Sequence, residues 1–160
     1  MKILIITQYF WPENFLINEL SLKLSERGNS IIVLTGKPNY PKGDIFKGYT
    51  QKGISKDKYG KVEIIRFPVR VRSKGPFNLI MNYLSFIYCG LTQFKTKIDS
   101  YKFDLIFVYA PSPILQVLPA IYLKRKFKIP LVLWVQDLWP ESIVATGYVK
   151  SKLIINLVRK

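Results

Sequence analysis

The sequence contains no histidine and only one cysteine, Cys89. Without an imidazole, the chain cannot assemble a His/Cys zinc site, a Ser-His-Asp triad or a Cys-His nucleophile. A single cysteine also excludes a disulfide framework within the chain. We therefore expect no metal site, and any chemistry must use carboxylates, amides, lysines and the backbone.

Acidic residues are also scarce, because 10 Asp and Glu stand against 25 Lys and Arg, which gives the 160-residue chain a net charge of +15. A basic surface suits an anionic membrane or a nucleic acid. No motif that reads DNA or RNA accompanies the charge, so we expect no nucleic-acid partner. Hydrophobic residues make up 49% of the chain, which is enough to build a core and argues against intrinsic disorder.

The first residues, MKILIITQYF, have neither the long apolar segment nor the small-residue cleavage site of a signal peptide. A single free cysteine agrees with a reducing compartment. We therefore expect a cytoplasmic protein.

Buried-strand runs alternate with helical patterns along the chain. Residues 2–7 and 30–35 are β-branched runs on either side of a helical pattern at 15–27, and this order predicts a parallel sheet. Further strands are expected at 61–67, 103–110 and 131–135, further helices at 112–127 and 151–160, and a long loop at 36–60. The sequence therefore predicts a single α/β domain, 1–160, with a doubly wound, Rossmann-like parallel sheet.

Residues 75–94 form a stretch of 20 residues without a charged side chain. The length would suffice for a membrane span, but amides such as Asn78 and Asn82 would each need a partner in hydrocarbon. We expect a core or interfacial helix instead. Contact with an anionic membrane surface is predicted through the basic residues before this helix and the aromatic residues within it: Arg70, Arg72, Lys74, Phe77, Tyr83, Phe86 and Tyr88.

Ligands of doubly wound sheets bind beyond the carboxyl ends of the strands, which directs attention to residues 8–14, 36–49 and 136–142. The first of these segments, QYFWPEN, contains no glycine, which argues against a dinucleotide cradle or a P-loop. Two interpretations remain open for Glu13 and Asn14. They cap the following helix, or they bind a hydroxyl-rich ligand beside the neighbouring aromatic residues.

The other two segments also leave alternatives open. Asp137 follows a hydrophobic strand, where partial burial would raise its pKa and suit general-base chemistry, or it begins a helix with Glu141 near the positive end of the helix dipole. In GKPNYPKGDIFKGY, several lysines lie among glycines and prolines. Such a loop suits a diphosphate, and the alternative is a solvated basic loop.

Three strings, ITQYFWPENF, LTGKPNYPKG and WVQDLWPES, resemble the N-terminal domain of bacterial glycosyltransferase family 4 enzymes. The likeness spans nearly the whole chain, and the group that it most resembles is the fucosamine transferases of O-antigen and capsule assembly. Two features depart from the family pattern. Asn14, Phe15 and Leu16 fill a region where many members have a glycine pair, and Gln136 stands where histidine is common.

The resemblance implies the N-terminal, acceptor-binding half of a GT-B enzyme that retains anomeric configuration and needs no metal. It implies no cofactor beyond a nucleotide sugar as co-substrate, which we expect to be UDP-linked, and a polyprenyl-diphosphate-linked glycan as acceptor. A C-terminal donor-binding domain, in the same chain or a separate one, would complete the site, and we expect the 160 residues alone to be inactive. The enzyme would lie at the inner face of the cell membrane. The alternative is a non-catalytic binding module, or a split subunit that docks with a donor-binding chain.

Within these motifs the catalytic candidates are Asp137 and, as competitor, Glu13. The expected substrate contacts are Asn14, Lys37, Asn39, Tyr40, Lys42, Gln136 and Glu141.

Overall fold

The computed structural model describes residues 1–137, and it contains one six-stranded sheet with the strand order β3-β4-β2-β1-β5-β6. Five strands run parallel, and β3 pairs antiparallel with β4 at one edge. The strands are β1 (Lys2–Ile6), β2 (Ser30–Gly36), β3 (Ser55–Tyr59), β4 (Val62–Phe67), β5 (Leu105–Ala110) and β6 (Leu131–Val135). The predicted Rossmann-like α/β fold is confirmed.

The winding of the chain reverses at β1. From β1 the chain steps outward to β2 and β4, and it then returns to the other side of β1 to form β5 and β6. Ile3 accordingly pairs with Ile31 of β2 on one side and with Leu105 of β5 on the other. The topological switch point therefore lies between the carboxyl ends of β1 and β5, where this class of sheet binds ligands.

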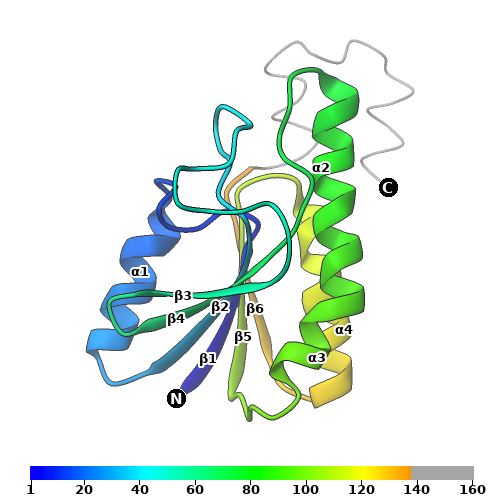
Figure 1. Ribbon diagram of the computed structural model, residues 1–160. Helices are drawn as coiled ribbons and strands as arrows, with labels where there is room; N and C mark the ends of the chain where they lie inside the picture. The colour runs from blue at the N-terminus through cyan, green and yellow to red at the C-terminus, as the bar shows by residue number, and fades with distance from the viewer. Residues whose placement is uncertain (138–160) are drawn as a thin grey trace.

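Helices cover both faces of the sheet. Figure 1 shows α1 (Leu16–Glu26) on one face and α2 (Pro76–Cys89), α3 (Lys95–Ile98) and α4 (Leu118–Phe127) on the other. Gly28, with φ of +84°, follows the end of α1 in the left-handed conformation typical of glycine at this position. Within residues 1–137, no helix has both the length and the apolar character needed to cross a membrane.

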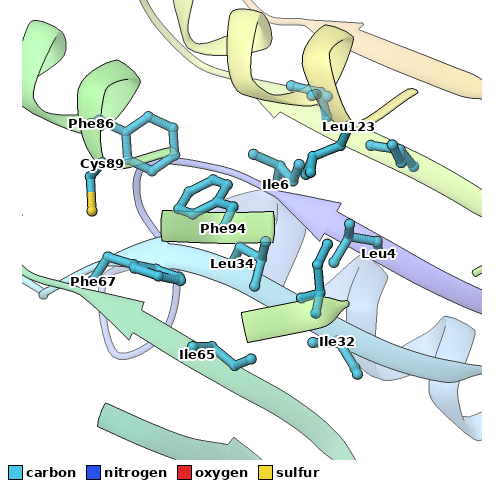
Figure 2. Packing of buried hydrophobic residues seen from close by; sticks show 14 of the residues in the cluster. Leu4, Ile6, Ile32, Leu34, Ile65, Phe67, Phe86, Cys89, Phe94 and Leu123 are labelled. Carbon is cyan, nitrogen blue, oxygen red and sulfur yellow. The ribbon is translucent and has the colours of Figure 1, made fainter. Parts of the chain in front are cut away.

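Each face of the sheet has its own apolar core, and β1 contributes to both. Leu4 and Ile6 pack with residues of α2 and α4, including Phe86 and Leu123, as Figure 2 shows. On the opposite face, Ile3 and Ile5 pack in the core that includes Ile17 of α1. Alternate residues of one buried strand thus stabilise two helical layers.

The helical segment after α2 is less regular than predicted. Residues Gly90–Phe94 form a π-helical turn that leads into α3, so the helix predicted at 75–94 extends to Ile98. A Cβ atom at Gly90 would lie 2.4 Å from Cγ of Pro119 in α4. Glycine at this position therefore lets α2 and α4 approach closely.

Two predictions of local structure are wrong. The loop predicted at 36–60 ends in strand β3, whose sequence SKDKY lacks the apolar run of a buried strand because it lies at the sheet edge. The helix predicted at 112–127 begins only at Leu118, after a 3₁₀ turn at Ile114–Val117, and Pro119 rather than Pro113 lies in its first turn. The helix predicted at 151–160 lies outside the described residues.

Candidate functional site

Aromatic rings from four segments gather at the carboxyl edge of the sheet. Tyr9 stacks on Phe15 with 5.5 Å between ring centroids, and Tyr40 lies 5.2 Å from each of them. Phe15 contacts Tyr109 at the end of β5, and Tyr109 contacts Trp134 of β6. Tyr9 and Phe15 follow β1, Tyr40 follows β2, and Tyr109 and Trp134 lie near the ends of β5 and β6, so segments far apart in the sequence meet at the carboxyl edge.

Two charged side chains of opposite sign accompany the rings. The guanidinium of Arg72 lies 5.1 Å from the ring centroid of Tyr40, a cation–π contact. Burial raises the pKa of Tyr83, Arg72 opposes that shift, and the carboxylate of Asp137 adds to it. Burial likewise raises the pKa of Tyr109, again with a contribution from Asp137. Asp137 therefore lies within electrostatic reach of both phenols.

We name this set the switch-point cluster. It consists of Tyr9, Phe15, Tyr40, Arg72, Tyr83, Tyr109 and Asp137. Asp137 is exposed, whereas Tyr9 and Tyr109 are buried and the remaining members are half-buried. The cluster thus presents an accessible carboxylate and aromatic surface toward solvent.

Glu13 is only 2% exposed and joins two loops. Its Oε1 accepts hydrogen bonds from the backbone N–H groups of Asn39 at 2.8 Å and Tyr40 at 2.7 Å, and its Oε2 accepts one from Phe10 at 3.1 Å. Both carboxylate oxygens are occupied by backbone donors. In this conformation Glu13 positions the loops after β1 and β2 and offers no free oxygen to a ligand.

Burial raises the pKa of Glu13 to about 7, although the three backbone N–H groups and the charge of Arg66 oppose this shift. The desolvation cost of the charged form therefore exceeds the stabilisation that its hydrogen bonds supply.

The interpretation that Glu13 and Asn14 cap α1 is wrong. The residue at the N-cap position is Phe15, which makes no side-chain capping bond, and Asn14 is exposed. Asn18 holds the turn instead, because its Oδ1 accepts from Trp11 N at 3.0 Å and its Nδ2 donates to the carbonyl of Glu13 at 2.6 Å. The sequence gave no signal for Asn18 beyond its place in the first turn of a helix.

The side chains predicted in the second loop point in different directions. Lys37 is buried, and its Nζ donates to Ser55 Oγ of β3 at 2.6 Å. Asn39 is buried as well, with its amide bonded to the carbonyl of Lys37 and to the N–H of Arg72. Tyr40 joins the switch-point cluster, and Lys42 is exposed. The interpretation as a solvated basic loop therefore fits Lys42. Lys37, Asn39 and Tyr40 instead form specific contacts.

Gly43 brings this loop against the segment after β4. Its φ is +86°, and a Cβ atom there would lie 2.0 Å from the carbonyl oxygen of Arg72. Only glycine fits both the dihedral angle and the close approach. Gly43 thus helps to position Arg72 beside Tyr40.

A buried amide network under the cluster was not predicted as part of a site. Asn82 of α2 is fully buried, and its Oδ1 accepts from Gln8 Nε2 at 2.6 Å and from the Tyr9 hydroxyl at 3.1 Å. Its Nδ2 donates to the carbonyl of Arg70. Asn82 thus has the protein partners that a buried amide requires, and they tie α2 to the end of β1.

The last described residues continue from β6. Gln136 and Asp137 are both exposed, so the partial burial expected for Asp137 is not found. The N–H of Gln136 donates to the carbonyl of Ala110 at 3.1 Å. That bond extends the pairing of β5 and β6 as far as the residue before Asp137. Glu141 lies outside the described residues.

The predicted membrane-contact residues divide between two environments. Arg70, Lys74 and Phe77 are exposed, and Phe77 is 68% exposed. Arg72 instead belongs to the switch-point cluster. Of the aromatic residues predicted with them, Phe86 lies in the core, so that part of the predicted aromatic face is wrong.

Comparison with known proteins supports the fold alone. No family model matches the chain, and no curated protein sequence matches it. Two crystal structures of the C-terminal domain of PF1911 hydrogenase from Pyrococcus furiosus are similar in structure. One is 18% identical with a TM-score of 0.53 over 86% of this chain and 90% of that chain, and the other is 17% identical with a TM-score of 0.52 over 83% and 90%. This likeness supports the Rossmann-like assignment.

Proposed function

We propose that the chain is the acceptor-side half of a retaining, metal-independent glycosyltransferase that acts in bacterial capsule or O-antigen synthesis. The three sequence motifs that resemble glycosyltransferase family 4 support the family. The observation that carries the chemistry is the exposed carboxylate of Asp137 at the switch point, beside Tyr83 and Tyr109. Aromatic surface with a few placed polar groups is typical of small-molecule and glycan sites.

In the proposed reaction, the acceptor hydroxyl loses a proton as it attacks the donor sugar. Asp137 would accept that proton or hold the hydroxyl in line with the donor sugar, and a positioned carboxylate suits either role. Glu13 would act indirectly, because its oxygens hold the backbone of Asn39 and Tyr40. The nucleotide sugar, expected to be UDP-linked, would come from a C-terminal donor-binding domain in the same chain or a separate one.

The proposed acceptor, a polyprenyl-diphosphate-linked glycan, would place the enzyme at the inner face of the cell membrane. An apolar stripe along α2 supports this location. Five large side chains at helical spacing, Phe77, Ile80, Leu84, Tyr88 and Leu91, are between 43% and 69% exposed. Arg70 and Lys74 lie just before the helix and add positive charge at one end of the stripe.

Replacement of Asp137 tests the proposal. In the enzyme with its donor-binding domain, Asp137→Asn should lower kcat by roughly 10² or more, the usual range for loss of a general base. The fold should be unchanged because Asp137 is exposed. Asp44→Asn, at another exposed loop carboxylate, is the matched control and should retain full turnover.

Glu13→Gln completes the test. If Asp137→Asn turns over normally while a stably folded Glu13→Gln enzyme is inactive, Glu13 carries the chemistry and Asp137 has only a structural role.

A further inference from the structure

Lys37 is a buried cation without an ionic partner. The residue is 2% exposed, and its ammonium makes one hydrogen bond, to Ser55 Oγ. Within residues 1–137, no carboxylate lies within ion-pair distance of it. Burial lowers the pKa of Lys37, and the neighbouring charge of Arg66 lowers it further. A buried, charged ammonium without a carboxylate partner destabilises the fold unless another negative group compensates its charge.

Arg66 is a second buried cation, and only some of its guanidinium N–H groups have a hydrogen-bond acceptor. Its Nε and Nη2 donate to Asp57 Oδ2 at 3.2 and 3.1 Å, and Nη2 also donates to the carbonyl of Trp11. Its Nη1 is buried and has no hydrogen-bond partner in the described part of the chain. The guanidinium lies over the ring of Tyr49, 5.0 Å from the centroid.

The carboxylate beside these cations is already neutralised. Asp57 Oδ2 accepts from Arg66 and from the Tyr49 hydroxyl, and Oδ1 accepts from the backbone N–H of Lys58. Asp57 therefore compensates Arg66, and it leaves the charge of Lys37 unbalanced.

A hollow of about 350 Å³ opens beside Lys37 on the β3 side of the loops. The hollow is lined by Lys37, Gly48, Tyr49, Thr50, Ser55, Lys56 and Asp57, and the Asp57 carboxylate is already bonded to Arg66, Tyr49 and Lys58. The lining provides two ammonium groups and the hydroxyls of Thr50 and Ser55, which are donors that suit a phosphate group. None of these residues belongs to the switch-point cluster.

We propose that this hollow binds a phosphate or diphosphate group, with Lys37 as its central cation and Ser55 as a hydroxyl donor. The bound anion would supply the negative charge that the buried Lys37 lacks. This site is inferred independently of the glycosyltransferase proposal, because it uses neither Asp137 nor Glu13 and shares with that proposal only Lys37, an expected substrate contact.

Thermal unfolding of the 160-residue chain with inorganic pyrophosphate tests the site, against sodium chloride at matched ionic strength. Pyrophosphate at ten times its Kd should raise the melting temperature by roughly 3–6 °C beyond the chloride control. Lys37→Met should abolish this increase, and Lys42→Met, which removes an exposed lysine of the same loop, should retain it. Ser55→Ala should weaken pyrophosphate binding several-fold.

The unliganded Lys37→Met protein supplies a second readout. Since the buried ammonium lacks a counter-charge, Lys37→Met should melt at a higher temperature than the wild type without anion. A higher melting temperature combined with loss of the pyrophosphate effect supports the proposal. An equal pyrophosphate effect in Lys37→Met and wild type, or no effect beyond chloride in the wild type, would overturn it.

Farnesyl diphosphate tests whether the site takes the diphosphate of a lipid or a free diphosphate. If its Kd is at least tenfold lower than that of pyrophosphate and the difference persists in Lys42→Met, the site takes a lipid diphosphate. Equal Kd values indicate a site for the diphosphate alone. In both cases Lys37→Met must abolish binding of the diphosphate. Binding that persists in Lys37→Met would overturn the proposal.

Discussion

Glu13 shows how a carboxylate can be essential to a site's shape while its oxygens remain out of a ligand's reach. Its three backbone partners lie in the loop after β1 and the loop after β2, and Glu13 and Asn39 are 26 residues apart in the sequence. Arg72, Tyr40 and Tyr9 depend on the same arrangement for their contacts. The position of the switch-point cluster therefore depends on a group that is costly to ionise.

The first prediction concerns the pH dependence of stability. Glu13 has a pKa of about 7 in the folded protein against an ordinary value of 4.5, so between these pH values the native state holds a proton that the unfolded chain has lost. The free energy of unfolding should therefore fall as pH rises from 4.5 to 7, by up to about 3 kcal/mol. Chemical denaturation at several pH values measures this slope.

Glu13→Gln should remove most of that slope, because glutamine does not titrate, whereas Asp44→Asn at an exposed site should keep it. Asp57 does not contribute to the slope between pH 4.5 and 7. Its pKa is lowered from 3.8, so its contribution to the free energy of unfolding is lost only at more acidic pH. Parallel pH curves for the wild type and Glu13→Gln would show that Glu13 does not titrate in this range.

At the same scale, the sequence predicted which loops meet at the carboxyl edge of the sheet better than which of their side chains are exposed there. The place of Asp137 at the carboxyl edge could be predicted, because it comes just after an apolar strand and the end of a strand fixes the position of the residues that follow. The contacts of Glu13, Lys37 and Asn39 could not be predicted, because each depends on a partner in another loop or strand. A carboxylate or lysine in a loop carries no local signal of such a partner.

Among the elements, α2 differs from its neighbours because one of its faces is apolar and exposed. The stripe from Phe77 to Leu91 recurs every three or four residues, which places its members on one side of the helix. Phe86 and Asn82 lie on the opposite side, in the core and the amide network. Tyr83 is half-buried and reaches the switch-point cluster.

The second prediction is that this stripe binds anionic membranes. The chain should sediment with vesicles containing phosphatidylglycerol at low salt, and less with vesicles of phosphatidylcholine alone. Each basic residue near the surface contributes about 1 kcal/mol, so removing the charges of Arg70 and Lys74 should weaken binding by roughly 30-fold. Phe77→Ser with Tyr88→Ser should also weaken it, because burial of both rings in the interface is lost.

The control for the stripe is a pair of exposed apolar residues on another helix. Leu118→Ser with Tyr122→Ser removes similar side chains from α4, where exposure is 41% and 38%, and should leave vesicle binding unchanged. If the α2 and α4 variants sediment equally well, the stripe does not face the membrane.

For the molecule as a whole, the strand pattern of the sequence was sufficient to predict a doubly wound sheet, because β1, β2 and β5 are apolar runs that could only be buried on both faces. Strand β3 was missed because an edge strand exposed on one side can be built from lysines. The strand at which the winding reverses, β1, could not be predicted, since it depends on how α2 and α4 pack on one face of the sheet.

The last prediction concerns the net charge of +15. Only two ion pairs join side chains within residues 1–137, Lys23 with Glu19 and Arg66 with Asp57, so most of the basic charge is uncompensated by direct contacts. Repulsion among these charges destabilises the folded state, and salt screens it over distances beyond about 10 Å at 0.1 M. The melting temperature should therefore rise as sodium chloride increases from 10 to 500 mM.

Charge variants separate this repulsion from ion binding at one site. Lys61→Glu with Lys102→Glu lowers the net charge at two exposed positions without touching the hollow beside Lys37, and should raise the melting temperature at 10 mM salt while reducing its salt dependence. Glu26→Lys, which adds positive charge on the exposed end of α1, should do the opposite. A melting temperature that stays constant or falls with salt in all three proteins would show that repulsion is not a significant term in the stability of this fold.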